Sequence, residues 1–82
     1  MIIDEKMQQL IDMAIAFNKQ NELYPQLVEY LIRQRYTQSQ VEAIMSNYLD
    51  DMTNEKHINE FRTLQDYRTA CKNYAKQLLK LE

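Results

Sequence analysis

The sequence predicts an all-α protein: a compact bundle of about four helices, with a helix-turn-helix in the middle and a long C-terminal helix. Glycine is absent from all 82 residues, so the residue that β-hairpin turns favour most is missing. Apolar residues recur three and four positions apart through most of the chain, which is the spacing of one face of an α-helix. Because a chain of this length supports one hydrophobic core, we expect residues 1–82 to form a single domain.

The first helix is expected from about Asp4 to Asn18. Asp4 is a favourable N-cap residue, and Glu5 places a negative charge in the positive first turn. The apolar stripe of this helix comprises Ile3, Met7, Leu10, Ala14 and Phe17. Residues 19–21 are interpreted as the turn that follows.

The second and third helices form the predicted helix-turn-helix, from Pro25 to Leu49. Pro25 is expected to start the second helix, because its missing amide hydrogen costs little in a first turn. The apolar pattern of this helix stops near Arg35. Thr37 and Gln40 then have the spacing of a capping box, which predicts the start of the third helix. The apolar face predicted for the third helix comprises Val41, Ile44, Met45, Tyr48 and Leu49.

The stretch from Leu27 to Leu49 resembles the first two helices of a ubiquitin-associated domain. In that family a short loop precedes a helix that opens with a capping residue and a valine, as Thr37 and Val41 do here. Arg35 and Tyr36 occupy the positions where the family has glycine followed by an aromatic residue. Because that glycine is missing, we do not assign the chain to this family.

The last helix is expected from about Thr53 to Lys80, with Thr53 or Asn54 as its cap. At 1.5 Å per residue it would reach roughly 40 Å, more than the second and third helices can cover. Three outcomes are therefore open: a break near Thr63, packing of the far end on the first helix, or an apolar face left for a partner. The residues expected to form such a surplus face are Tyr67, Tyr74, Leu78 and Leu81.

The composition argues against catalysis, metal binding and nucleotide binding. Without glycine, phosphate-binding loops and nucleophile elbows lack the backbone freedom that they need. Cys71 and His57 are the only cysteine and the only histidine, too few ligands for a structural zinc site. Ser39 and Ser46 lie on the polar side of the third helix, whereas His57 starts the next one. We therefore expect no enzymatic activity, no catalytic or metal-binding residues and no cofactor.

Hydropathy and residue usage give two further expectations. No apolar run approaches the roughly 20 residues of a membrane span, and the N-terminus lacks the pattern of a secretory signal. We therefore expect a cytoplasmic protein that does not bind membranes. Lys, Asn, Ile and Tyr are frequent while Gly, Pro and Ala are scarce, a bias that fits an A/T-rich coding sequence and points to a low-GC bacterium or a phage.

Two kinds of side chain are candidates for partner contact. Arg68, Lys72, Lys76 and Lys80 recur every four residues and form a basic strip along the last helix. Such a strip fits an acidic protein surface or nucleic acid, but it also suits a solvated face near the negative end of a helix, which is the interpretation we prefer. Tyrosine is enriched at interfaces. The tyrosines that we select on this ground are Tyr30, Tyr67 and Tyr74.

The leading functional hypothesis is a non-enzymatic protein-protein interaction module, a small regulator or assembly factor. Its partner is expected to be a protein, with self-association through the last helix as one form of the hypothesis. The alternative is a nucleic-acid-binding regulator that uses the basic strip. Recognition of DNA by the third helix is disfavoured, because residues 37–51 contain no lysine or arginine to attract phosphates.

Overall fold

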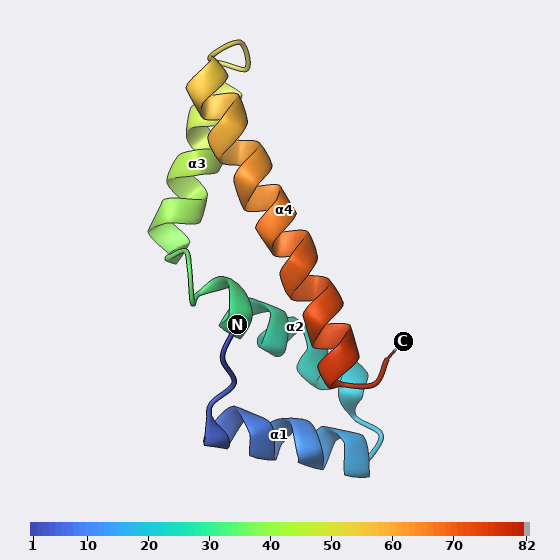
Figure 1. The fold of residues 1–82 in the computed structure, drawn as a ribbon. Coiled ribbons are helices and arrows are strands. Elements are labelled where there is room, and N and C mark those ends of the chain that lie inside the picture. Colours follow the sequence, from blue (N-terminus) through green and yellow to red (C-terminus); the bar gives the residue numbers. More distant parts are fainter. Residues whose placement is uncertain (82) are drawn as a thin grey trace.

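The computed structural model describes residues 1–81, and Glu82, the last residue of the predicted domain, lies outside this range. The described residues form α1 (Glu5–Ala16), α2 (Gln20–Ile32), α3 (Gln38–Asp50) and α4 (Glu55–Leu78), with no strand among them. Figure 1 shows α1 and α2 at one end of the molecule, while α3 runs beside the first half of α4 at the other end. The predicted all-α bundle of four helices, with a long last helix, is confirmed.

The start of α1 follows the prediction, but the start of α2 does not. The Asp4 carboxylate accepts a hydrogen bond from the Met7 amide at 2.7 Å, which caps α1 as expected. At the other end, Asn18 adopts a positive φ of 56°, a conformation that asparagine tolerates at helix ends. Because this residue reverses the chain at once, α2 begins at Gln20 and Pro25 lies inside the helix. The prediction that Pro25 starts α2, with residues 19–21 as the turn, was therefore wrong.

The capping signals predicted for α3 and α4 are both confirmed. Thr37 Oγ1 accepts from the Gln40 amide at 3.1 Å, and Gln40 Oε1 accepts from the Thr37 amide at 2.8 Å. These two bonds complete the capping box. Of the two caps considered for α4, the one observed is Asn54, whose Oδ1 accepts from the His57 amide at 3.2 Å.

Helix α4 is the long element on which α2 and α3 pack. It runs without a break from Glu55 to Leu78, so the break considered near Thr63 does not occur. Helix α3 pairs with its first half and α2 with its second half, one after the other along its length (Figure 1). The expectation that α2 and α3 could not cover this length was wrong, because each of the two helices packs on a different half of α4 (Figure 1). Helix α1 packs on α2 instead.

The core lies at the end of the molecule where α1, α2 and the second half of α4 meet. Its buried side chains come mostly from these three elements, whereas α3 contributes Val41 alone. The fully buried members with large side chains are Ile11, Leu27, Leu31, Leu64, Cys71 and Leu79. We call α3 together with the first half of α4 the arm, residues 38–66. The arm is therefore a helix pair with little core of its own.

The overall shape follows from the arm. The molecule measures 47 × 22 × 18 Å, and its radius of gyration is 15.0 Å. A closely packed domain of this length is expected at about 12 Å. Within residues 1–81, no helix combines the length and the apolar character needed to cross a membrane.

Candidate functional site

Tyr30 lies on α2 and contacts the N-terminal segment. Its hydroxyl oxygen accepts a hydrogen bond from the Asp4 amide at 3.1 Å, and its ring is half-buried. Nearby, Gln34 Oε1 accepts from the Ile2 amide at 3.0 Å, and the side-chain amide of Gln34 donates back to the Ile2 carbonyl. Tyr30 therefore helps to hold the N-terminal segment against α2. We selected this side chain for partner contact, but its hydroxyl and part of its ring are occupied by contacts within the chain.

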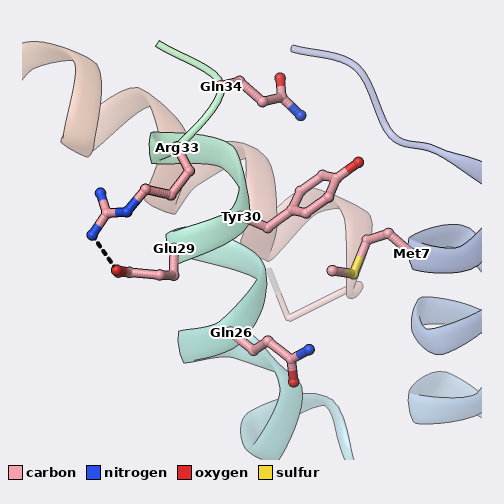
Figure 2. A pocket seen from close by; sticks show the side chains of 6 residues that line it. All are labelled: Met7, Gln26, Glu29, Tyr30, Arg33 and Gln34. Atoms are coloured by element: carbon pink, nitrogen blue, oxygen red, sulfur yellow. Dashed lines mark hydrogen bonds and ion pairs between the residues drawn. The ribbon is translucent and has the colours of Figure 1, made fainter. Parts of the chain in front are cut away.

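A groove of about 560 Å³ opens between α1 and α2 beside Tyr30. Figure 2 shows Met7 entering it from α1, and the side chains of α2 along the other wall. The charged residues of the groove, Arg33 and Glu29, form an ion pair with each other, and Arg33 also donates to Gln38. The remaining lining residues are Gln26, Tyr30 and Gln34. No cysteine, serine or histidine is among them.

Tyr67 and Tyr74 of α4 are half-buried and pack against the core. The Tyr67 hydroxyl donates to the Leu31 carbonyl at 3.0 Å, and its ring centroid lies 5.7 Å from that of Tyr36. The guanidinium of Arg35 sits 5.2 Å from the Tyr67 ring centroid, a cation–π distance. Burial raises the pKa of the Tyr67 hydroxyl, and the neighbouring Cys71 raises it further.

The apolar face that we expected to be left over at the far end of α4 is covered. All four of its predicted members are partly buried against the core: Tyr67, Tyr74, Leu78 and Leu81. The sequence pattern also missed Leu79, which is fully buried. Leu79 follows Cys71 and Ala75 at intervals of four, so the spacing does contain the signal.

The basic strip is exposed along most of its length. Lys72, Lys76 and Lys80 are exposed, and Arg68 is half-buried. Within residues 1–81 the two ion pairs are Lys19–Glu22 and Arg33–Glu29, so neither involves the strip. Lys80 lies just beyond the end of α4 and has a positive φ of 56°.

Arg68 lines a recess of about 340 Å³ where α2, α3 and α4 meet. Its lining comprises Glu29, Ile32, Arg33, Gln38, Val41, Met45 and Arg68. It connects the basic strip to the arm, because Met45 lies on α3 and Arg68 on α4.

The largest exposed apolar side chains of the arm lie on α3 and in the turn that follows it. Leu49 is 65% exposed, Met52 53% and Met45 36%. We call these three residues the arm face. Met45 and Leu49 are four residues apart and so lie on the same side of α3. Beside them, the rings of Tyr48 and Phe61 stack at 4.1 Å between centroids and bridge α3 to α4.

Acidic residues follow Leu49 and Met52 closely in the sequence. Asp50 and Asp51 directly follow Leu49, and Glu55 opens α4. Asp51 Oδ1 accepts hydrogen bonds from the Thr53 amide at 3.0 Å and from the Thr53 hydroxyl at 2.6 Å. These bonds lower the pKa of the Asp51 carboxyl, so the tip of the arm keeps its negative charge.

Sequence reasoning did not identify the arm face as a surface. Met45 and Leu49 were predicted to lie in the core, because their spacing with Val41 is that of a buried stripe. The structure buries Val41 but leaves Leu49 mostly exposed. Periodicity shows which side chains share a helix face, but it does not show how far along the helix that face is covered.

Comparison of the chain with protein-family models, with curated proteins and with solved structures found no match. Among residues 1–81 no three side chains of His, Cys, Asp or Glu are grouped as metal ligands. The Cys71 thiol is buried, and burial raises its pKa. The arm face and the basic strip are the two surfaces on which the functional proposals below rest.

Proposed function

We propose that this chain is a non-enzymatic protein-protein interaction module, a small regulator or assembly factor, and that the arm face is its binding surface. The observation that carries the proposal is the exposure of Met45 and Leu49 on one side of α3, with exposed Met52 in the turn that follows this helix. Clustered exposed apolar side chains with a polar surround are typical of protein-binding sites. A helix face of this kind is normally buried against another element.

The charge around the arm face indicates the chemistry of the partner. Asp50, Asp51 and Glu55 place negative charge beside the apolar side chains, and complementary potentials favour association. The partner surface is therefore expected to have an apolar centre and a basic rim. Leu49 is the central contact, since it is the most exposed apolar side chain of the arm.

Photo-crosslinking in the native host tests this proposal. A photoreactive amino acid at position 49 should give a defined protein adduct. The same amino acid at position 43 should not, because Ala43 is exposed on another side of α3. A Leu49→Asn substitution combined with a crosslinker at position 52 should reduce the adduct. Equal adducts from positions 43 and 49, or none from either, would contradict the proposal.

A nucleic-acid-binding regulator is the second candidate. Lys72, Lys76 and Lys80 favour it, because they are exposed and form no ion pair within residues 1–81. Binding to phosphates releases counterions, so the affinity should fall steeply with salt. Fluorescence anisotropy with labelled DNA and RNA at low salt, comparing the wild type with Lys72→Gln/Lys76→Gln, tests this candidate. No low-salt binding by the wild type would remove it.

A further inference from the structure

We infer that the partner of the arm face is a second copy of this chain, in an antiparallel two-fold dimer that sets the arm of each copy against the basic strip of the other. The inference rests on the proposed function and names its partner. Two features of the molecule support it, the separation of charge along α4 and the surface area left exposed, and the length of α4 sets the register of the dimer.

Charge is divided along the long axis of the molecule. The arm carries more acidic than basic residues: Glu42, Asp50, Asp51, Glu55, Glu60 and Asp66 against Lys56 and Arg62. Residues 67–81 carry the four bases of the basic strip and no acid. Two copies side by side in a parallel arrangement would bring like charges together. An antiparallel arrangement pairs the acidic arm with the basic strip twice, as two-fold symmetry requires.

The length of α4 sets the register of such a dimer. The midpoint of α4 lies between Asp66 and Tyr67. If two antiparallel copies of α4 overlap fully, Lys76 comes level with His57 of the second copy, and Leu78 at the end of one helix with Glu55 at the start of the other. These levels are at the tip of the arm, where Asp50, Asp51 and Glu55 gather. The basic strip therefore provides the rim chemistry expected of the partner, and the aliphatic stems of its lysines can lie on the arm face.

The exposed area is consistent with an interface of ordinary size. The chain has an accessible surface of 5803 Å² for a mass of 9.9 kDa, whereas a folded monomer of that mass is expected to expose about 5200 Å². The excess of about 600 Å² belongs to the elongated molecule as a whole, and it is of the same order as the roughly 800 Å² that each partner contributes to a stable interface. Each copy measures 47 × 22 × 18 Å, so side-by-side pairing along α4 would give a dimer that is less elongated than one copy alone.

A charge-exchange experiment on the full chain tests the inference. The strip variant carries Lys72→Glu and Lys76→Glu, and the tip variant carries Asp50→Lys and Glu55→Lys. Each homodimer would contain two repulsive contacts, so its dissociation constant should rise by about tenfold or more. In an equimolar mixture, the acidic arm of the strip variant meets the basic strip of the tip variant. At the second contact, the strip that has been made acidic meets the tip that has been made basic, so both contacts are attractive. The heterodimer should therefore form with nearly the wild-type affinity.

The control variant carries Asn73→Glu and Gln77→Glu, which add the same type of charge on exposed positions of α4 outside the strip. It should dimerise almost as the wild type does. Sedimentation equilibrium and native mass spectrometry report the species, and circular dichroism confirms that every variant is helical. Two results would overturn the antiparallel arrangement. One is that both charge-reversal variants dimerise with the wild-type dissociation constant, and the other is that their equimolar mixture forms no heterodimer.

A wild-type chain that stays monomeric at high protein concentration would overturn the second copy as partner. That result would leave the proposed function intact if position 49 still crosslinks to another protein in the host. Failure of both experiments would remove the arm face as a binding surface, so the two outcomes are distinguishable.

Discussion

Leu64 and Leu49 form a matched pair for testing where the arm is covered and where it is open. Leu64 is fully buried and Leu49 is 65% exposed, and both lie in helices. Replacing a buried leucine by alanine removes its transfer free energy and leaves a cavity, which together cost about 3 kcal/mol. Leu49 has about one third of its surface buried, so at about 0.8 kcal/mol per buried methylene the same change should cost less than about 1 kcal/mol.

Urea denaturation followed by circular dichroism measures both changes. The experiment should use protein dilute enough to be monomeric, so that association does not add to stability. With a slope of about 1 kcal/mol per molar urea, Leu64→Ala should lower the transition midpoint by several molar or abolish folding, and Leu49→Ala by less than about 1 M. Ile11→Val, a smaller change at a buried position, should cost about 1 kcal/mol and keep a measurable baseline.

The comparison contradicts the structure if Leu49→Ala is as costly as Leu64→Ala in dilute protein. Such a result would mean that another part of the chain covers the arm face. If Leu49→Ala becomes costly only as the concentration rises, the additional loss reports association through the arm.

Three further predictions concern local features. Thr37→Ala removes one bond of the capping box and should destabilise the protein by about 1 kcal/mol in the same urea assay, with Gln40→Ala costing less because the Thr37 hydroxyl still caps. Thr53→Val should raise the pKa of the Asp51 carboxyl toward its ordinary value, because the hydrogen bond from the Thr53 hydroxyl to this carboxyl is lost. An NMR titration of the Asp51 carboxyl carbon measures this shift. Since the folded-state pKa of Asp51 is lowered, its contribution to stability is present above the unfolded-state pKa and is lost as the pH falls through the folded-state value. Finally, the Cys71 thiol should react with a thiol reagent at pH 8 only after unfolding, because it is buried and burial raises its pKa; rapid native reaction would contradict that burial.

Several features of the fold could be read from the sequence because they depend on neighbouring residues. The capping box of Thr37 and Gln40 and the cap at Asp4 each depend on residues within a turn of one another. The start of α2 could not be placed in this way. Pro25 is a common first-turn residue, but Asn18 closed the preceding turn early and the helix began before the proline.

Among the candidate contact residues, the sequence identified the lysines of the basic strip as an exposed set, since charged side chains at helical spacing remain in solvent in most arrangements. The sequence could not show which tyrosines would be used in contacts within the chain and which would be left for a partner. The Tyr30 hydroxyl accepts a hydrogen bond from the Asp4 amide, and the Tyr67 hydroxyl donates one to the Leu31 carbonyl. Such contacts between distant segments exist only once the helices are placed. The arm face was missed for the same reason.

The sequence by itself therefore determined the helices, most of their ends and the unequal distribution of charge along α4, because local hydrogen bonding and periodicity govern these features. The tertiary structure decided how the helices share their apolar faces. Helix α3 pairs with one half of α4 and α2 with the other, so the core forms where α1 adds a third layer. Where only α3 and α4 meet, no third layer covers the apolar stripe of α3, so Met45 and Leu49 remain exposed, as does Met52 in the turn between the two helices.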